Sequence, residues 1–87
     1  MRVITYNPAN DIENSCATLD SVKRDMVVML VAAQEIAIYY VDAQGHYSSE
    51  LFLIRPAQAE FSDAERTQAR IAFMTAKALA KALYKPK

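Results

Sequence analysis

Residues 36–56 have the sequence IAIYYVDAQGHYSSELFLIRP, which contains the clearest local structural signal of the chain. Two runs rich in β-branched and aromatic residues, 36–41 and 47–54, flank the turn-forming segment 42–46. Asp42 suits the start of a type I turn, and Gly45, the only glycine of the chain, suits a positive φ. Arg55-Pro56 ends the second run, because proline holds the preceding residue extended and donates no ladder hydrogen bond. The stretch therefore predicts a β-hairpin over residues 36–54.

Both faces of this hairpin are largely apolar if Val41 pairs with Tyr47. One face would carry Ala37, Tyr39, Val41, Tyr47, Leu51 and Leu53, and the other Ile36, Ile38, Tyr40, Phe52 and Ile54. A small sheet covered on one side normally leaves its other face wet and polar. An uncovered face of this composition would be a contact surface, whereas helices packed on both faces would cover it.

After the hairpin, the chain predicts a long helix that starts at Ser62 and ends before Pro86. Ser62 and Glu65 have the spacing of a capping box, and the residues that follow are mostly good helix formers. On a helical wheel one side should face the core, and it carries Ile71, Thr75, Leu79, Ala82 and Leu83.

The other side of this helix carries a basic stripe. Its members are Arg66, Arg70, Lys77, Lys81 and Lys85, with Phe73 and Met74 within or beside them and Tyr84 at the border. Residues 62–87 hold 6 Lys and Arg against 2 Asp and Glu, while residues 1–61 hold 4 against 8. The stripe suits an acidic protein surface or a nucleic-acid backbone, with an aromatic ring available for stacking. The plainer reading is a solvated charged face.

Before the hairpin, residues 2–6 predict a short strand that ends at the turn-forming pair Asn7-Pro8. Asn10 followed by Glu13 resembles a helix start, and apolar residues then recur at steps of three and four up to Ala33. These features favour one helix from Asn10 to Ala33, since no Gly, Asn or Pro is present to turn the chain near Ala32. The alternative makes Met26 to Val31 a buried strand.

The expected fold class is therefore α+β, as a single small domain over residues 1–87 with the order β-α-β-β-α. The alternative order is α-β-β-β-α. Apolar residues make up 53% of the chain and charged residues 23%, which is ordinary globular composition. No Gly-rich linker or repeat divides the sequence.

The residue counts argue against catalysis, so we expect no catalytic residue, no cofactor and no metal. One His and one Cys are too few for a structural zinc site, and one Gly is too few for a phosphate-binding loop. His46 is expected to be a solvated turn residue, and Cys16 a small buried apolar side chain. With one cysteine, no secretory signal and an apolar run too short to span a membrane, a cytoplasmic location is expected.

These observations favour a small protein-binding module that either self-associates through its sheet or docks on a larger complex as an adaptor or inhibitor. Small accessory proteins, including those with which viruses block a host complex, share this profile. The partner would have an acidic surface, and the residues expected to bind it are Arg66, Arg70, Phe73, Lys77, Lys81, Tyr39 and Tyr47. No membrane partner is expected.

The alternative function is nucleic-acid binding through the basic side of the last helix. The order α-β-β-β-α is the layout of double-stranded RNA-binding domains, although no matching loop motif is present. The formal net charge of zero and the pI near 6.5 disfavour this alternative, because dedicated nucleic-acid binders are usually basic.

Overall fold

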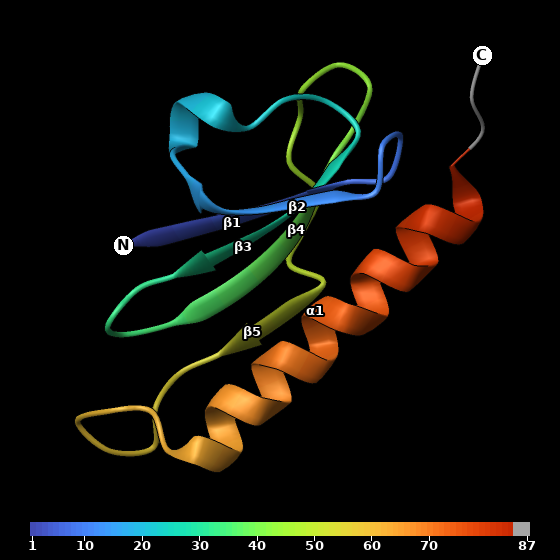
Figure 1. Ribbon diagram of the computed structural model, residues 1–87. Coiled ribbons are helices and arrows are strands. Elements are labelled where there is room, and N and C mark those ends of the chain that lie inside the picture. The colour runs from blue at the N-terminus through green and yellow to red at the C-terminus, as the bar shows by residue number, and fades with distance from the viewer. Residues whose placement is uncertain (85–87) are drawn as a thin grey trace.

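Five antiparallel strands and one long helix form an α+β fold in the computed structural model, which describes residues 1–84 apart from the side chain of Cys16. The strands follow the spatial order β2-β1-β3-β4-β5. Helix α1 crosses one face of the sheet, and the short 3₁₀ helix η1 lies on the other side (Figure 1). The elements are β1 (Arg2–Asn7), β2 (Ile12–Ala17), η1 (Leu19–Ser21), β3 (Met26–Val31), β4 (Ile36–Val41), β5 (Phe52–Ile54) and α1 (Asp63–Leu83).

The hairpin predicted over residues 36–54 is present as β4 and β5. Val41 bridges Tyr47 as predicted, and Ile38 pairs with Phe52. Between these two pairs, the second arm holds residues 48–51 and the first arm only residues 39–40, so the two arms cannot pair continuously. Strand β5 therefore begins at Phe52 and is shorter than the predicted strand over 47–54. Gly45 has a φ of 82°, and the carboxylate of Asp42 accepts hydrogen bonds from the N–H groups of Gln44 and His46. The turn therefore uses both signals that the sequence supplies.

The predicted helix from Asn10 to Ala33 is wrong, and so are both predicted element orders. Residues 8–11 instead form the turn between β1 and β2, in which the side chain of Asn10 accepts a hydrogen bond from the N–H of Ile12. Asp11 adopts a φ of 59°, a left-handed conformation that Asp tolerates. Asn10 thus stabilises a tight turn with the same side-chain chemistry that had suggested a helix cap.

Residues 26–31 form the central strand β3, as the alternative interpretation held. It pairs with β1 on one side and β4 on the other, and its side chains are buried alternately on both faces of the sheet. A strand that is buried on both faces has an uninterrupted run of apolar residues. Such a run also contains apolar residues at steps of three and four, so the helical spacing did not distinguish a helix from a strand. The short polar side chains of Asn14, Ser15 and Thr18 also weaken a helix, because they compete for backbone hydrogen bonds.

The turn between β3 and β4 needs no glycine. The N–H of Ala32 donates to the carbonyl of Glu35 across the turn at 2.9 Å. Within the described residues, positive φ occurs only at Asp11, Asp25 and Gly45, so this turn contains none. The lack of turn-forming residues near Ala32 therefore did not exclude a reversal of the chain.

Helix α1 begins as predicted. The hydroxyl of Ser62 accepts from the N–H of Glu65, whose carboxylate accepts in return from the N–H of Ser62. Glu65 also accepts from the N–H of Ala57, and these backbone hydrogen bonds, led by that from Ser62, lower the pKa of the Glu65 carboxyl. The start of α1 is thus tied to the loop that follows β5. In the described part of the chain, no helix has both the length and the apolar character needed to cross a membrane.

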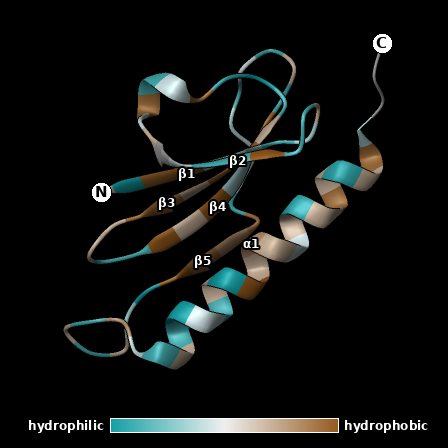
Figure 2. Ribbon diagram, viewed as in Figure 1, coloured by the Kyte–Doolittle hydropathy of each residue, from teal (hydrophilic) through white to brown (hydrophobic). Residues whose placement is uncertain are grey.

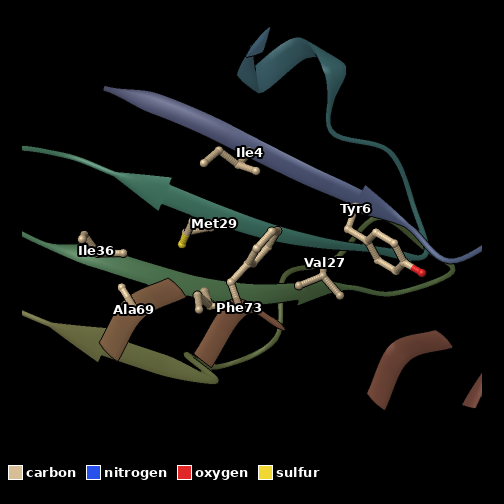
Figure 3. Close-up of a cluster of buried hydrophobic side chains, with 8 residues drawn as sticks. Ile4, Tyr6, Val27, Met29, Ile36, Ala69 and Phe73 are labelled. Carbon is tan, nitrogen blue, oxygen red and sulfur yellow. The ribbon is translucent and has the colours of Figure 1, made fainter. Parts of the chain in front are cut away.

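Strands β3, β4 and β5 consist largely of hydrophobic residues (Figure 2), and apolar side chains pack on both faces of the sheet. The larger cluster lies between the sheet and α1, where Phe73 points toward Val27 and Met29 (Figure 3). Its buried members are Ile4, Tyr6, Val27, Met29, Ile36, Ile38, Ala69 and Phe73. The smaller cluster holds Val3, Val28 and Val41, with partly buried Ala17, Val22, Met26 and Leu30 packed against it. Residues 17–22, which include η1, therefore supply part of the cover on the face without α1.

Candidate functional site

Helix α1 contacts the sheet through small residues and one aromatic ring. Ala69 and Phe73 are buried, and Ala72, Ala76 and Ala80 are partly buried against the same cluster. Alanine has almost no side chain to separate the two layers, so the helix can lie close to the sheet. The ring of Phe73 then fills the space between them.

The side of α1 predicted to face the core is wrong. Its residues Ile71, Leu79 and Leu83 are 58%, 59% and 68% exposed, and Thr75 and Ala82 are exposed as well. Phe73, placed by the sequence within the basic stripe, is only 4% exposed and cannot stack on a ligand. The helix has two apolar faces, and helical periodicity alone does not decide which of them packs on the sheet.

The basic stripe lies along a groove between α1 and the sheet. Arg66, Arg70 and Lys77 reach the groove from α1, and Arg2 reaches it from β1. The groove encloses about 400 Å³, and Ile4, Met29, Val31, Ile36, Ala69, Phe73 and Met74 are its apolar lining. Glu13 of β2 is its only acidic lining residue. The structure thus brings three of the predicted cations together and adds one, Arg2.

Two lysines of the stripe are held by acidic residues of the first hairpin, which is formed by β1 and β2. Lys77 pairs with Glu13, and Lys81 pairs with Asp11 at 3.1 Å. The ammonium group of Lys77 also lies 5.6 Å from the ring centre of Tyr6 and 5.4 Å from that of Phe73. These contacts reduce the positive charge that the two lysines offer to a ligand.

Tyr6 and Asp11 form a hydrogen bond next to these lysines. The Tyr6 hydroxyl donates to the Asp11 carboxylate at 2.7 Å. This bond, with burial and the Asp11 charge, raises the pKa of Tyr6 to about 12. The same bond, followed by the contact with Lys81, lowers the pKa of the Asp11 carboxyl. The first hairpin is therefore linked to α1 through Asp11, which contacts both Tyr6 and Lys81.

Replacing Tyr6 with phenylalanine should remove the tyrosine ionisation step near pH 12. Because the pKa rises from 10.0 to about 12 on folding, the neutral hydroxyl stabilises the fold fully below pH 10. That contribution is lost as the pH rises from 10 through 12. The variant should therefore show a weaker pH dependence of stability in this window, as measured by ultraviolet titration and by urea unfolding at a series of pH values.

The control for this prediction is Tyr47→Phe, because Tyr47 is exposed and distant from Asp11. It should leave the step near pH 12 in place. If Tyr6→Phe retains that step, the hydrogen bond to Asp11 does not hold the Tyr6 proton.

Three arginines around the groove have no acidic partner. Among the described residues, Arg2, Arg66 and Arg70 form no ion pair, whereas Arg55 pairs with Glu35 at 3.5 Å. Arg66 and Arg70 lie one helical turn apart and thus project from the same side of α1. The arginine end of the groove therefore holds the uncompensated positive charge.

A second, apolar hollow of about 310 Å³ lies at the other end of α1. Leu79 and Leu83 line it with Leu51, and its other lining residues are Val27, Tyr40, Ala76, Ala80 and Tyr84. Leu51 therefore lies on the side of α1, and not with Tyr39 as the sequence suggested. The hollow adjoins the exposed aliphatic residues of α1, so the two form one apolar region.

Tyr39 and Tyr47 lie away from the other predicted binding residues. Their rings make an edge-to-face contact with centres 5.7 Å apart, on the sheet face opposite α1. Burial, followed by the charges of Glu50 and Glu35, raises the pKa of Tyr39. The predicted binding residues thus belong to two separate surfaces. His46 is exposed in the hairpin turn, as expected, whereas the predicted burial of Cys16 and the position of Lys85 fall outside the described residues.

Sequence reasoning missed Arg2, Glu13 and Asp11. The alternation of Arg2, Ile4 and Tyr6 along β1 was a usable signal, because it places these side chains on one face of the strand. Glu13 and Asp11 gave no such signal, since they were assigned to a helix start. In the part of the chain that the structure describes, no group of three or more His, Cys, Asp or Glu could hold a metal ion. Comparisons of the chain with protein-family models, curated proteins and solved structures find no match.

Proposed function

We propose that this chain acts without catalysis, by binding another protein through α1 as an adaptor or inhibitor on a larger complex. The observation that carries the proposal is the row of large aliphatic side chains that α1 leaves exposed. Ile71, Met74, Leu79 and Leu83 are all more than half exposed, although they belong to a regular helix that packs on the sheet. Exposed apolar patches of this kind mark contact surfaces.

The energetic reason is that these side chains keep more than half of their surface exposed in the folded chain. Burying one large aliphatic side chain stabilises a structure by about 1.5–3 kcal/mol, so four of them are a substantial source of binding free energy. The core side of α1 is already filled by alanines and Phe73. The exposed row therefore adds little to folding and is available for a partner.

A second copy of the chain is one partner of this kind. Self-association through the sheet would use the face opposite α1, where Tyr47 and Leu53 are exposed. Sedimentation equilibrium of the wild type and of Leu53→Glu separates the two surfaces. A dimer that Leu53→Glu dissociates would use the sheet, whereas one that Leu79→Gln dissociates would use α1. The single cysteine, which allows no internal disulfide, supports a cytoplasmic location.

The test of the proposal places a photo-crosslinking amino acid at Ile71 of the full chain in its native cell. The expected result is a discrete protein adduct that persists after nuclease treatment. The same amino acid at Leu19, which is also exposed but lies in η1, should give no such adduct. Adding Leu79→Gln to the Ile71 probe should weaken the adduct severalfold, while adding Ile12→Gln should not. Equal adducts from positions 71 and 19 would contradict the proposal.

Nucleic-acid binding is the second candidate, and the three unpaired arginines of the groove favour it. Two observations weigh against it: Lys77 and Lys81 are already paired with carboxylates, and Phe73 is too buried to stack on a base. Loss of the adduct on nuclease treatment, with binding that weakens steeply with salt, would support nucleic acid over protein.

A further inference from the structure

We propose that the groove between α1 and strands β1 and β3 binds an acidic peptide segment of the partner, with one apolar side chain inserted between its carboxylates. This inference rests on the proposed function, because it names the chemistry of the protein segment that would bind. The groove is distinct from the exposed aliphatic row, although the two meet at Met74.

Charge complementarity is the first argument. Four cations and one carboxylate line the groove, and the carboxylate of Glu13 is already paired with Lys77. Arg2, Arg66 and Arg70 are left without an acidic partner among the described residues. A guanidinium group binds a carboxylate through two parallel hydrogen bonds, which makes arginine well suited to an acidic side chain. These three unpaired guanidinium groups therefore favour the binding of an anionic ligand.

The lining of the groove is the second argument. Ile4, Met29 and Phe73 are core residues at the base of the groove, and partly exposed Val31 and exposed Met74 add apolar surface at its sides. A nucleic-acid backbone or a free phosphate would satisfy the arginines but would leave the exposed apolar surface of Val31 and Met74 without a partner. A peptide supplies both parts, because carboxylate and aliphatic side chains can follow each other along one chain. The volume of about 400 Å³ is enough for a large apolar side chain.

Continuity with the aliphatic row is the third argument. Met74 lines the groove and is also 58% exposed on the solvent side of α1. One partner can therefore contact the aliphatic row with an apolar surface and reach the groove with an adjoining acidic segment. Flexible methionine side chains adapt readily to such mixed surfaces.

The experiment measures fluorescence anisotropy of the full chain with three labelled synthetic peptides. One is glutamate-rich with a central leucine, one replaces its glutamates with glutamine, and one replaces its leucine with serine. The first should bind best, each of the others about tenfold more weakly, and added salt should weaken the first. The double variant Arg66→Glu and Arg70→Glu should reduce binding of the first peptide by about tenfold or more.

The matched control is Lys23→Glu with Arg24→Glu, which changes the net charge equally at exposed residues outside the groove. It should retain binding. Equal losses in the two double variants, or equal binding of the glutamate and glutamine peptides, would overturn the inference. So would tighter binding of a single-stranded oligonucleotide than of the acidic peptide.

Failure of the inference is distinguishable from failure of the proposed function. If Arg66→Glu with Arg70→Glu leaves the adduct at Ile71 unchanged and does not affect peptide binding, the groove is not used but α1 still binds protein. If the adduct at Ile71 is absent altogether, the proposed function itself fails. Circular dichroism spectra that match the wild type show that the variants remain folded.

Discussion

Replacing Phe73 with alanine should destabilise the fold by about 3–5 kcal/mol, because it leaves a cavity between α1 and the sheet. The ring is 4% exposed and belongs to the cluster with Val27 and Met29. Alanine is the best helix former, so the loss measures packing and not helix propensity. A domain of this size has a small free energy of unfolding, so this loss removes much of it. Urea should therefore unfold the variant at a much lower concentration than the wild type.

The control for Phe73→Ala is Ile71→Ala, only two positions away on the same helix. Ile71 is exposed, so its replacement should change stability by no more than about 0.5 kcal/mol. This pair of variants tests the rotation of α1 about its axis. The reverse order of effects, with Ile71→Ala the more damaging, would mean that the face predicted from sequence packs on the sheet.

Replacing Val28 with aspartate should prevent folding at neutral pH. Val28 has no exposed surface and lies in the central strand β3, where it packs with Val3 and Val41. An ionised carboxylate placed there would have no partner, and burying it costs several kcal/mol or more. The expected result is loss of the cooperative urea transition and a disordered circular dichroism spectrum.

Leu19→Asp is the control for Val28→Asp. The helix predicted from Asn10 to Ala33 would have placed Leu19 on its apolar face, since Ile12, Cys16, Leu19, Val22, Met26, Met29, Leu30 and Ala33 recur at steps of three and four. Val28 would have lain off that face. The structure reverses these positions, with Leu19 52% exposed in η1. Leu19→Asp should therefore fold with nearly wild-type stability. If Val28→Asp folds and Leu19→Asp does not, this part of the chain forms the predicted helix and not strands.

Helix α1 carries two separate sets of apolar residues. It closes the larger core cluster with Ala69, Phe73 and the neighbouring alanines, and it leaves larger aliphatic residues exposed. Exposed aliphatic side chains promote aggregation, so their presence on one helix supports the proposed binding role. Because the row adds little to folding, it can change without loss of the fold.

The candidate site was predictable in part. The helical wheel placed Arg66, Arg70 and Lys77 on one side, and the structure brings all three to one groove. The helical wheel could not predict that Arg2 and Glu13 line the groove, because their position next to α1 depends on how β1 and β2 pair with the rest of the sheet. Phe73 was placed among the cations by its angle on the wheel, although its ring forms the floor of the groove. The angular position of a residue on a helix predicts which residues of the same helix lie beside it. It does not predict how deeply each side chain is buried against the sheet.

The β4–β5 hairpin and the start of α1 could be predicted from the amino-acid sequence alone. Both depend on local chemistry: Asp42 and Gly45 make the turn, and Ser62 with Glu65 satisfies the first N–H groups of the helix. Such hydrogen bonds join residues close in the chain, so their partners can be identified without knowing the rest of the fold.

Contacts between distant parts of the chain made residues 12–31 mainly strands and selected the face of α1 that is buried. The segment 26–31 fits a helix by its spacing and a strand by its composition, and it became a strand because β1 and β4 bond to both of its edges. Likewise, α1 has two apolar faces, and the alanine face packs inward because it allows Phe73 to reach Val27 and Met29. Both choices depend on contacts between residues distant in sequence, which maximise burial over the whole chain and leave no mark on local periodicity.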